Sequence, residues 1–133
     1  MAEFTVGDVI AERTLHLTRE SLVRYAGASG DFNPIHYRDD VATAVGLPGV
    51  LAHGMLTMGI ASSVVLSALP ADTRVIEYGV RFTKPVVVDA ETGADVHVVA
   101  KVGAVDETAA RIDLTVKAAE TTVLVKAQLR IAR

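Results

Sequence analysis

Residues 29–36 bring together side chains that can move protons. The stretch reads Ser-Gly-Asp-Phe-Asn-Pro-Ile-His, so the carboxylate of Asp31 lies five residues before the imidazole of His36. Pro34 fixes its own φ and disfavours the helical region for Asn33 before it. We therefore expect a shaped loop rather than a turn of helix. Two titratable groups on one rigid loop can share a water molecule, an arrangement suited to general acid–base catalysis.

Helices are predicted on both sides of this loop. Thr18 is a suitable N-cap for a helix that runs to about Ala26. After the loop, Asp39 or Asp40 can cap a short helix that Gly46 ends. The loop is therefore expected to be held between two helix ends.

The most apolar part of the chain follows. Residues 52–55 read Ala-His-Gly-Met and open a run in which small and apolar side chains recur at helical spacing to about Ala68. The stretch 54–71 contains Thr, Ser and Pro and falls short of the roughly 20 apolar residues that a membrane-spanning helix needs. We therefore expect a helix that is buried in protein.

The C-terminal part of the chain changes to an alternating pattern. Four segments alternate apolar and polar residues, which predicts four strands with one buried face each: 76–82, 96–102, 112–116 and 123–131. Turn-forming pairs at Gly93, Asp106 and Glu120 predict hairpins and an antiparallel sheet, and a short strand is expected within residues 4–16. The fold class is α+β, with the sheet wrapped around the long helix, because nothing else in the sequence can cover that helix.

Composition excludes several classes of function. The 133 residues are 50% hydrophobic and 22% charged, so we expect one domain over residues 1–133, with apolar surface buried in its core or against another subunit. The net charge of −3 attracts neither nucleic acid nor an anionic membrane, and we expect neither as a partner. Without cysteine there is no disulfide, thiolate metal site or thiol nucleophile. A reducing compartment fits this, no signal peptide pattern is visible, and we expect a cytoplasmic protein.

Two motifs resemble those of a known family. Residues 25–36, Tyr-Ala-Gly-Ala-Ser-Gly-Asp-Phe-Asn-Pro-Ile-His, with Ala42 six residues later, are similar to the signature of the MaoC-like (R)-specific enoyl-CoA hydratases. Ala-His-Gly-Met at 52–55 resembles the second motif of that family, and residues 77–86 resemble its first long strand after the helix. The likeness covers nearly the whole chain. It looks closest to the catalytic B-type subunit of the mycobacterial-type (3R)-hydroxyacyl-ACP dehydratase.

This resemblance implies a hotdog fold, in which an antiparallel sheet wraps a long central helix. It also implies a homodimer, or a heterodimer with a second hotdog subunit, in which the two sheets join edge to edge. The implied reaction is the reversible syn addition of water to an acyl-CoA or acyl-ACP enoyl thioester in fatty-acid metabolism, with no metal and no cofactor. Carried over to this sequence, Asp31 and His36 are the catalytic pair, and the amide of Gly54 binds the thioester carbonyl.

The chemistry explains these residue types. When the C2–H bond breaks, negative charge moves to the thioester oxygen, and a backbone N–H aimed at that oxygen is worth about 3 kcal/mol. Gly54 begins the apolar helix, so its free amide lies at the positive end of the helix dipole, and glycine lets a substrate come close. Histidine as a residue type titrates near neutral pH, which suits His36 to take the C2 proton. Asp31 can hold or protonate the departing hydroxyl.

Several of these candidates also have a purely structural interpretation. Asp-x-Asn-Pro is by itself a common turn, and Asn33 is expected to shape the loop. His53 can contribute to the site, although a histidine at a helix start is more often structural. Ser62 can contact Asp31 from the helix or bond back to its own helix. Asp31, His36 and His53 also match a metal site of two histidines and one carboxylate, which we do not expect because no further ligand cluster supports it.

Two other functions are alternatives. The first is a non-catalytic hotdog subunit that binds acyl chains and stabilises the catalytic partner of a heterodimeric dehydratase. The second is a hotdog thioesterase, which also needs a carboxylate near a helix N-terminus. The intact pair of Asp31 and His36 argues against the first, and the Asn-Pro-Ile-His loop does not suggest the second.

Overall fold

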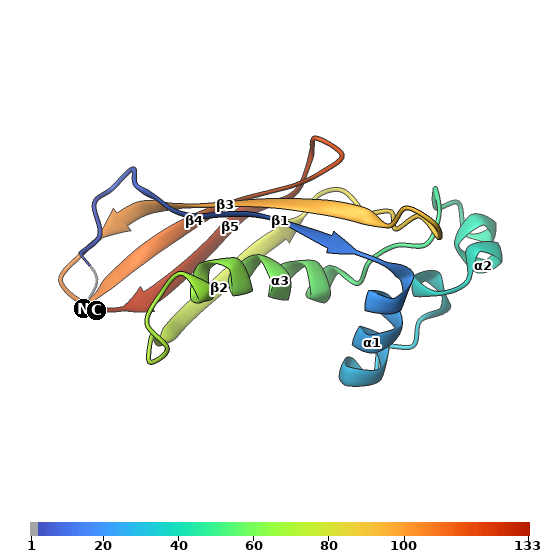
Figure 1. The fold of residues 1–133 in the computed structure, drawn as a ribbon, viewed down its shortest axis with the longest axis horizontal. Helices are drawn as coiled ribbons and strands as arrows, with labels where there is room; N and C mark the ends of the chain where they lie inside the picture. Colours follow the sequence, from blue (N-terminus) through green and yellow to red (C-terminus); the bar gives the residue numbers. More distant parts are fainter. Residues whose placement is uncertain (1–2) are drawn as a thin grey trace.

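One antiparallel sheet and one long helix dominate the computed structural model, which describes residues 3–133. The five strands lie in the order β1-β3-β4-β5-β2 (Figure 1). In chain order the elements are β1 (Val9–Leu17), α1 (Arg19–Ser29), the 3-10 turn η1 (Pro34–His36), α2 (Asp39–Ala44), α3 (Gly54–Ser67), β2 (Val75–Phe82), β3 (Ala94–Val105), β4 (Ala109–Ala118) and β5 (Thr121–Ala132). The α+β architecture predicted from the sequence is confirmed.

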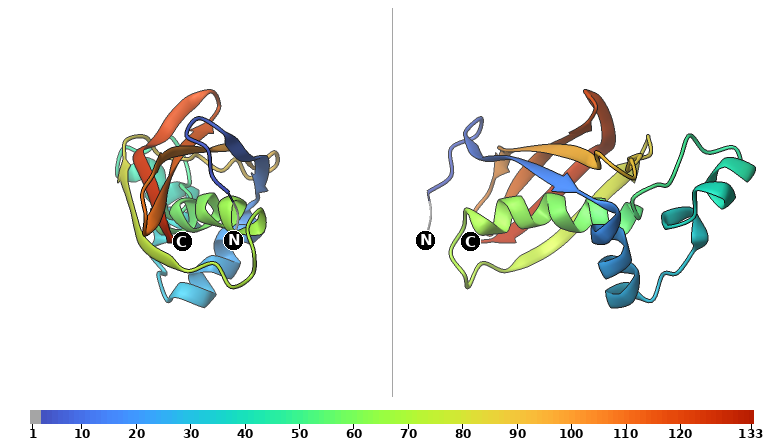
Figure 2. Two further views of the ribbon diagram at one scale, coloured as in Figure 1. Left: turned by 90° about the vertical axis from the view of Figure 1, so that its left-hand side faces the viewer. Right: turned by 45° about the vertical axis from the view of Figure 1, so that its right-hand side comes forward.

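The alternating pattern of the strands builds the core. In β3, Val96, Val98 and Ala100 are 0% exposed, whereas Lys101 on the other face is exposed. Burying a valine or leucine side chain completely contributes roughly 1.5–3 kcal/mol relative to leaving it in water. The apolar face of each strand therefore packs against the helix. The sheet curves around α3 as a result, which Figure 2 shows from the end of the molecule.

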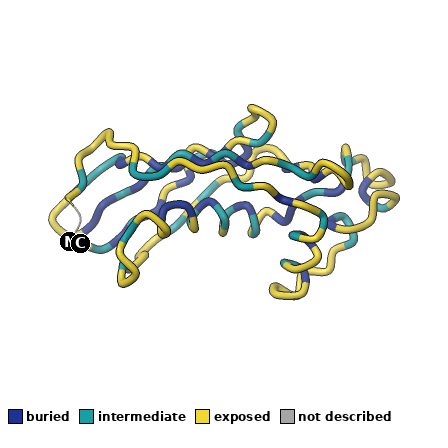
Figure 3. Tube along the Cα trace, in the orientation of Figure 1, coloured by how far each residue is buried: buried dark blue, intermediate teal, exposed yellow. Residues whose placement is uncertain are grey.

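The sheet covers only one side of α3. Thr57, Ala61 and Val64 are buried, whereas the side chain of Met55 is 60% exposed and that of Leu66 is 37% exposed. Figure 3 shows this alternation of buried and exposed residues along the helix. An apolar strip of α3 therefore stays open in the single chain.

No helix within residues 3–133 has both the length and the apolar character that crossing a membrane would require.

The helices before α3 lie beyond one end of the sheet and carry the polar loop (Figure 1). The N-cap prediction for Thr18 is confirmed, because its hydroxyl accepts a hydrogen bond from the amide of Ser21. Helix α1 continues to Ser29, three residues past the predicted end, and stops at Gly30, whose φ of 76° is the left-handed conformation that glycine adopts without strain. The loop therefore begins immediately at this left-handed residue.

The cap predicted for α2 is wrong. Arg38 occupies the N-cap position, and Asp39 and Asp40 lie in the first turn of the helix. Both carboxylates are bound by guanidinium groups instead, Asp39 by Arg19 and Asp40 by Arg38. An acidic first turn still stabilises α2 through the helix dipole, so the sequence pattern indicates the helix correctly but places its first residue wrongly.

Candidate active site

The loop between α1 and α2 is held by its own polar side chains. The hydroxyl of Ser29 accepts a hydrogen bond from the amide of Asp31, at 3.1 Å. The Asp31 carboxylate accepts one from the amide of Asn33, also at 3.1 Å, and the Asn33 side chain accepts one from the amide of Ile35, at 3.2 Å. Side chains of this type replace the backbone partners that a helix would provide. Asn33 lies where the sequence predicts, as a residue that shapes the loop.

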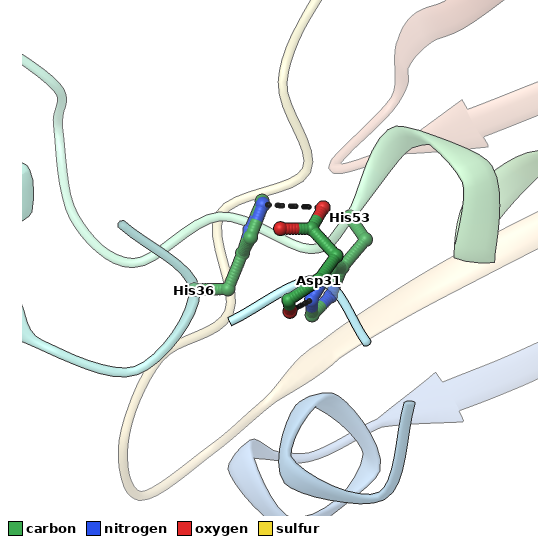
Figure 4. A group of neighbouring side chains, drawn as sticks. All are labelled: Asp31, His36 and His53. Atoms are coloured by element: carbon green, nitrogen blue, oxygen red, sulfur yellow. Dashed lines mark hydrogen bonds and ion pairs between the residues drawn. The ribbon is translucent and has the colours of Figure 1, made fainter. Parts of the chain in front are cut away.

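The His36 ring has one defined tautomer. Its Nδ1 lies 2.6 Å from the carbonyl oxygen of Leu51, and a carbonyl can only accept, so Nδ1 carries the hydrogen and donates it. In the neutral ring Nε2 therefore has the lone pair, and this nitrogen faces the Asp31 carboxylate at 3.9 Å (Figure 4). This separation is too long for a direct hydrogen bond. The pair therefore places an imidazole nitrogen and a carboxylate oxygen side by side, without a direct hydrogen bond between them.

The two members of the pair differ in their contact with solvent. The side chain of His36 is 10% exposed, and that of Asp31 is 52% exposed. The imidazole is thus fixed in protein, and the carboxylate lies at the open side of the site.

A short extended segment, residues 50–52, fixes the carbonyl that orients His36. The Ala52 amide donates to the carbonyl of Val86, and the Val88 amide donates to that of Val50, each at 2.9 Å. The Leu51 amide donates to the carbonyl of Ile35, at 3.2 Å. The sequence does not predict this segment, because it orients His36 through main-chain atoms, which every residue carries.

Arg19 ties the same segment to the helices. Its Nε donates to the Val88 carbonyl at 2.7 Å, and its two terminal nitrogens bind Asp39 at 3.1 and 2.7 Å. The guanidinium holds the pKa of the Asp39 carboxyl below its ordinary value, mainly through this side-chain hydrogen bond. Arg19, at the start of α1, therefore connects this helix to α2 and to Val88, whose amide bonds the carbonyl of Val50.

Gly54 and His36 line the same cavity. It has a volume of about 330 Å³, and its wall also includes Thr57, Phe82 and Lys84. Gly54 is the first residue of α3, so its amide is one of the four at a helix start that have no partner inside the helix. A Cβ at this position would lie 3.0 Å from the Cε1 of Phe82, so glycine keeps this part of the wall open. His36 and the first residue of α3 therefore both belong to the wall of one cavity.

His53 lies behind the pair rather than in the cavity wall. It is 1% exposed, and its Nε2 lies 3.1 Å from the main-chain oxygen of Asp31. Its ring stacks on that of His36, with centroids 3.8 Å apart and an angle of 21° between the planes, and it meets the ring of Tyr25 edge-on at 4.8 Å. Burial lowers the pKa of His53 below its ordinary value, and the hydrogen bond to the Asp31 main chain offsets only part of this shift. His53 is therefore a neutral buried imidazole.

The structure does not bring Ser62 to this group. Its hydroxyl donates to the carbonyl of Gly59 at 2.8 Å, so it bonds back to its own helix. Ser62 is eight residues beyond Gly54 in α3, a rise of about 12 Å along the helix axis.

Asp31, His36 and His53 do lie together as possible metal ligands, with one candidate atom from each within 4.8 Å of the others. The two imidazoles are stacked, however, so their in-plane lone pairs run side by side rather than toward one point. The Nε2 of His53 also points to the Asp31 carbonyl. This geometry favours the acid–base interpretation of the pair over metal ligation.

Comparison with known proteins agrees with the fold. A sequence profile of the MaoC like domain matches residues 3–123. The chain is 39% identical over 79 residues to 3-hydroxyacyl-thioester dehydratase X of Mycobacterium tuberculosis, a match that covers 59% of this chain and 27% of that protein. This chain spans about a quarter and about half of the lengths of the two curated relatives that it matches.

Solved structures share the architecture. R-hydratase PhaJ1 from Pseudomonas aeruginosa is 28% identical with a TM-score of 0.82, over 98% of this chain and 81% of that chain. A chain of the ChsH1-ChsH2 complex from Mycobacterium tuberculosis is 19% identical with a TM-score of 0.87, over 98% of both chains, and shows the same fold. The predicted hotdog architecture is confirmed. Because the profile spans most of the sequence, the predicted resemblance is confirmed as well, and this chain belongs to the MaoC-like domain family.

Proposed function

We propose that this chain catalyses the reversible, syn addition of water to 2-enoyl thioesters, giving (3R)-hydroxyacyl thioesters, as a hydro-lyase of fatty-acid metabolism. One observation carries the proposal. The free Nε2 of His36 lies 3.9 Å from the Asp31 carboxylate, and the same imidazole shares a cavity with the Gly54 amide. The curated relatives in Mycobacterium tuberculosis and Arabidopsis thaliana are named as 3-hydroxyacyl-thioester and 3-hydroxyacyl-[acyl-carrier-protein] dehydratases, which supports the reaction class.

In the dehydration direction, the proposal gives one task to each group. The Nε2 of His36 takes the proton from C2, and the electron pair of that C–H bond forms the 2,3-double bond as the C3–O bond breaks. Charge that develops on the thioester oxygen is stabilised by the amide of Gly54. Asp31, in its protonated form, gives its proton to the departing hydroxyl, which leaves as water. A water molecule that hydrogen-bonds to both groups then carries a proton from His36 back to Asp31, which restores the pair, because the two atoms are too far apart for direct transfer.

The syn course follows from the placement of the pair. Both groups come from one loop and lie 3.9 Å apart. In this proposal they act on the substrate from one side, so the proton and the hydroxyl leave from the same face. Hydration is the same sequence in reverse, with one water held between Asp31 and His36.

The substrate carrier and the partner belong to the same proposal. The carrier is coenzyme A or acyl carrier protein, and the active form is a dimer, either of two copies of this chain or with a second hotdog subunit. The exposed apolar strip of α3 and the unpaired edge of β2 support a partner. The ChsH1-ChsH2 structure, in which the matched chain has this fold, is a complex of differently named chains.

The test follows the enoyl absorbance of crotonyl-CoA. Hydration removes the conjugated band without releasing thiol, a thioesterase releases thiol, and a non-catalytic subunit does neither. We expect loss of the band with no thiol, and thiol release or no change in a folded dimer would contradict the proposal.

Substitution of the pair identifies the residues that act. We expect Asp31→Asn and His36→Ala each to lower kcat by about a hundredfold or more with the fold intact, because each removes one side of the proton transfer. The double variant should be barely slower than either single one, because residues that act as a unit are not additive. Turnover close to the wild type in either single variant would remove that residue from the mechanism.

A further inference from the structure

The buried imidazole of His53 contacts both members of the candidate pair, and the proposed mechanism gives it no task. Its Nε2 reaches the main-chain oxygen of Asp31 at 3.1 Å, and its ring lies against His36 at a centroid distance of 3.8 Å. Figure 4 shows the three side chains together, with a dashed line from the Nε2 of His36 to the Asp31 carboxylate. His53 does not line the cavity that holds Gly54 and Phe82. Its influence on a reaction in that cavity must therefore pass through Asp31 and His36.

The hydrogen bond of His53 defines its charge state. Because the Asp31 oxygen only accepts, Nε2 carries the hydrogen and Nδ1 carries a lone pair. Within residues 3–133 that Nδ1 is buried without a hydrogen-bond partner. Protonation would put a second N–H into this buried position without an acceptor, and burial accordingly lowers the pKa of His53. The ring facing His36 is therefore uncharged.

Helix capping does not account for His53. The residue is at the N-cap position of α3, but its side chain makes no capping hydrogen bond. Its side-chain partners are the Asp31 main chain, the His36 ring and the edge of Tyr25. These are also the titratable residues that face it. A histidine whose function was to begin α3 would direct a ring nitrogen to the amides of that helix.

We propose that His53 is a positioning residue with two separable tasks: its Nε2–H holds the main chain at Asp31, and its neutral ring supports the imidazolium that forms on His36 during turnover. The second task follows from the stack. When His36 takes a proton, its positive charge develops 3.8 Å from an uncharged aromatic face, which attracts a cation, whereas a charged His53 would repel it. The inference rests on the proposed acid–base function of the pair.

Two substitutions separate the tasks. His53→Gln keeps an N–H donor at about the same reach and removes the ring, whereas His53→Phe keeps a ring in the stack and removes the donor. His97→Gln is the matched control, because His97 is a surface histidine that bonds Glu12 and Thr14. The measurements are kcat and KM for crotonyl-CoA between pH 5 and 9, together with Tm.

We expect kcat to fall about ten- to a hundredfold in both variants, with KM changed much less, because a displacement of a reacting group by about 1 Å costs up to a hundredfold in rate. In His53→Phe the loss should be the same at every pH, because the neutral ring is still present. In His53→Gln the acid limb of the kcat profile should also move to lower pH, because the imidazolium has lost its support. His97→Gln should match the wild type.

Wild-type kcat in both variants at temperatures where they are folded would overturn the inference, as would a loss of Tm with no change in turnover. If the wild-type protein itself showed no hydration, the proposed function would fail first. NMR titration of the His36 ring in wild type and His53→Gln then tests the contact without turnover. Identical titration curves for His36 in the two proteins would overturn the supporting role of the ring.

Discussion

At the scale of single residues, the acid–base pair is fixed by main-chain atoms. The Leu51 carbonyl sets the tautomer of His36, and the Asp31 carbonyl receives a hydrogen bond from His53. Histidines at reacting centres are commonly oriented through the ring nitrogen that does not react. Here the orienting acceptor is a peptide oxygen, which has no charge to gain or lose. The proton-accepting nitrogen of His36 therefore faces Asp31 whatever the ionisation of the carboxylates nearby.

The amide of Gly54 can be tested through the backbone. Gly54→Pro removes the N–H, and proline is accepted at the first position of a helix. His53 before it has φ of −57° and ψ of 131°, which a residue preceding proline adopts readily. We expect kcat to be about a hundredfold lower in Gly54→Pro than in Gly54→Ala, because the donor to the thioester oxygen is lost.

Gly54→Ala is the required control, since both variants add a Cβ that would lie 3.0 Å from Phe82 Cε1. The effect of the Cβ therefore cancels in the comparison, and the remaining difference is the N–H, which the ring atoms of proline replace. Equal turnover of the two folded variants would show that the carbonyl is polarised by another group.

The sequence predicts side chains at the site better than it predicts their partners. Asp31, Asn33 and His36 lie on one local loop, so eight consecutive residues contain the information that places them. The contacts of His36 with Leu51 and of His53 with the Asp31 carbonyl join residues 15 and 22 positions apart through main-chain oxygens. A peptide oxygen has no signature in a sequence, so such contacts need the fold.

At the scale of elements, residues 50–52 connect the segment 86–88 to the loop that carries His36. The two segments pair, and Arg19 binds the carbonyl of Val88 while holding Asp39 in α2. The sequence predicted helices on both sides of the loop, and both exist. It did not predict this link, because the alternating pattern of a strand is absent from so short a segment.

Arg19→Lys tests whether the link matters. A lysine can keep one contact with Asp39 but cannot bind the carboxylate with two nitrogens and also reach the Val88 carbonyl. We expect Tm to fall by about 3 °C or more and kcat to fall a few-fold, because the Leu51 carbonyl then holds His36 less firmly.

Arg24→Lys in the same helix is the control. Arg24 pairs with Glu20 on the exposed face, and such surface pairs contribute little to stability. If Arg19→Lys and Arg24→Lys behave alike in thermal unfolding and turnover, the link through Arg19 has no structural importance.

At the scale of the whole molecule, the two edges of the sheet are not equivalent. Strand β2 ends the sheet on one side and carries the exposed apolar residues Ile76 and Phe82, and the open strip of α3 adds Met55 and Leu66. We expect a dimer in which β2 pairs with a partner strand. Ile76→Lys should shift the mass measured by light scattering at micromolar concentration toward the monomer, because charge on an edge strand opposes pairing.

The opposite edge provides the comparison. Val9 in β1 is 56% exposed, and Val9→Lys should leave the dimer intact. A monomeric wild-type protein that is folded and active, or dissociation by Val9→Lys in place of Ile76→Lys, would contradict this assignment of the interface.

Stability should depend on pH through His53. Its pKa in the folded protein lies below the ordinary value of 6.5, so below about pH 6.5 the unfolded chain binds a proton that the folded protein does not. The stability that follows from keeping His53 neutral is fully present above pH 6.5 and is lost as the pH falls from there toward the folded pKa.

We therefore expect Tm to fall between pH 7 and pH 5 by more in the wild type than in His53→Phe, which has no group to protonate at this position. His16 and His97 are common to both proteins and bond other residues, so their contributions cancel in the difference, and His36 keeps an aromatic partner in His53→Phe. Equal changes of Tm in scanning calorimetry at the two pH values would mean that His53 is as easily protonated in the folded protein as in the unfolded chain.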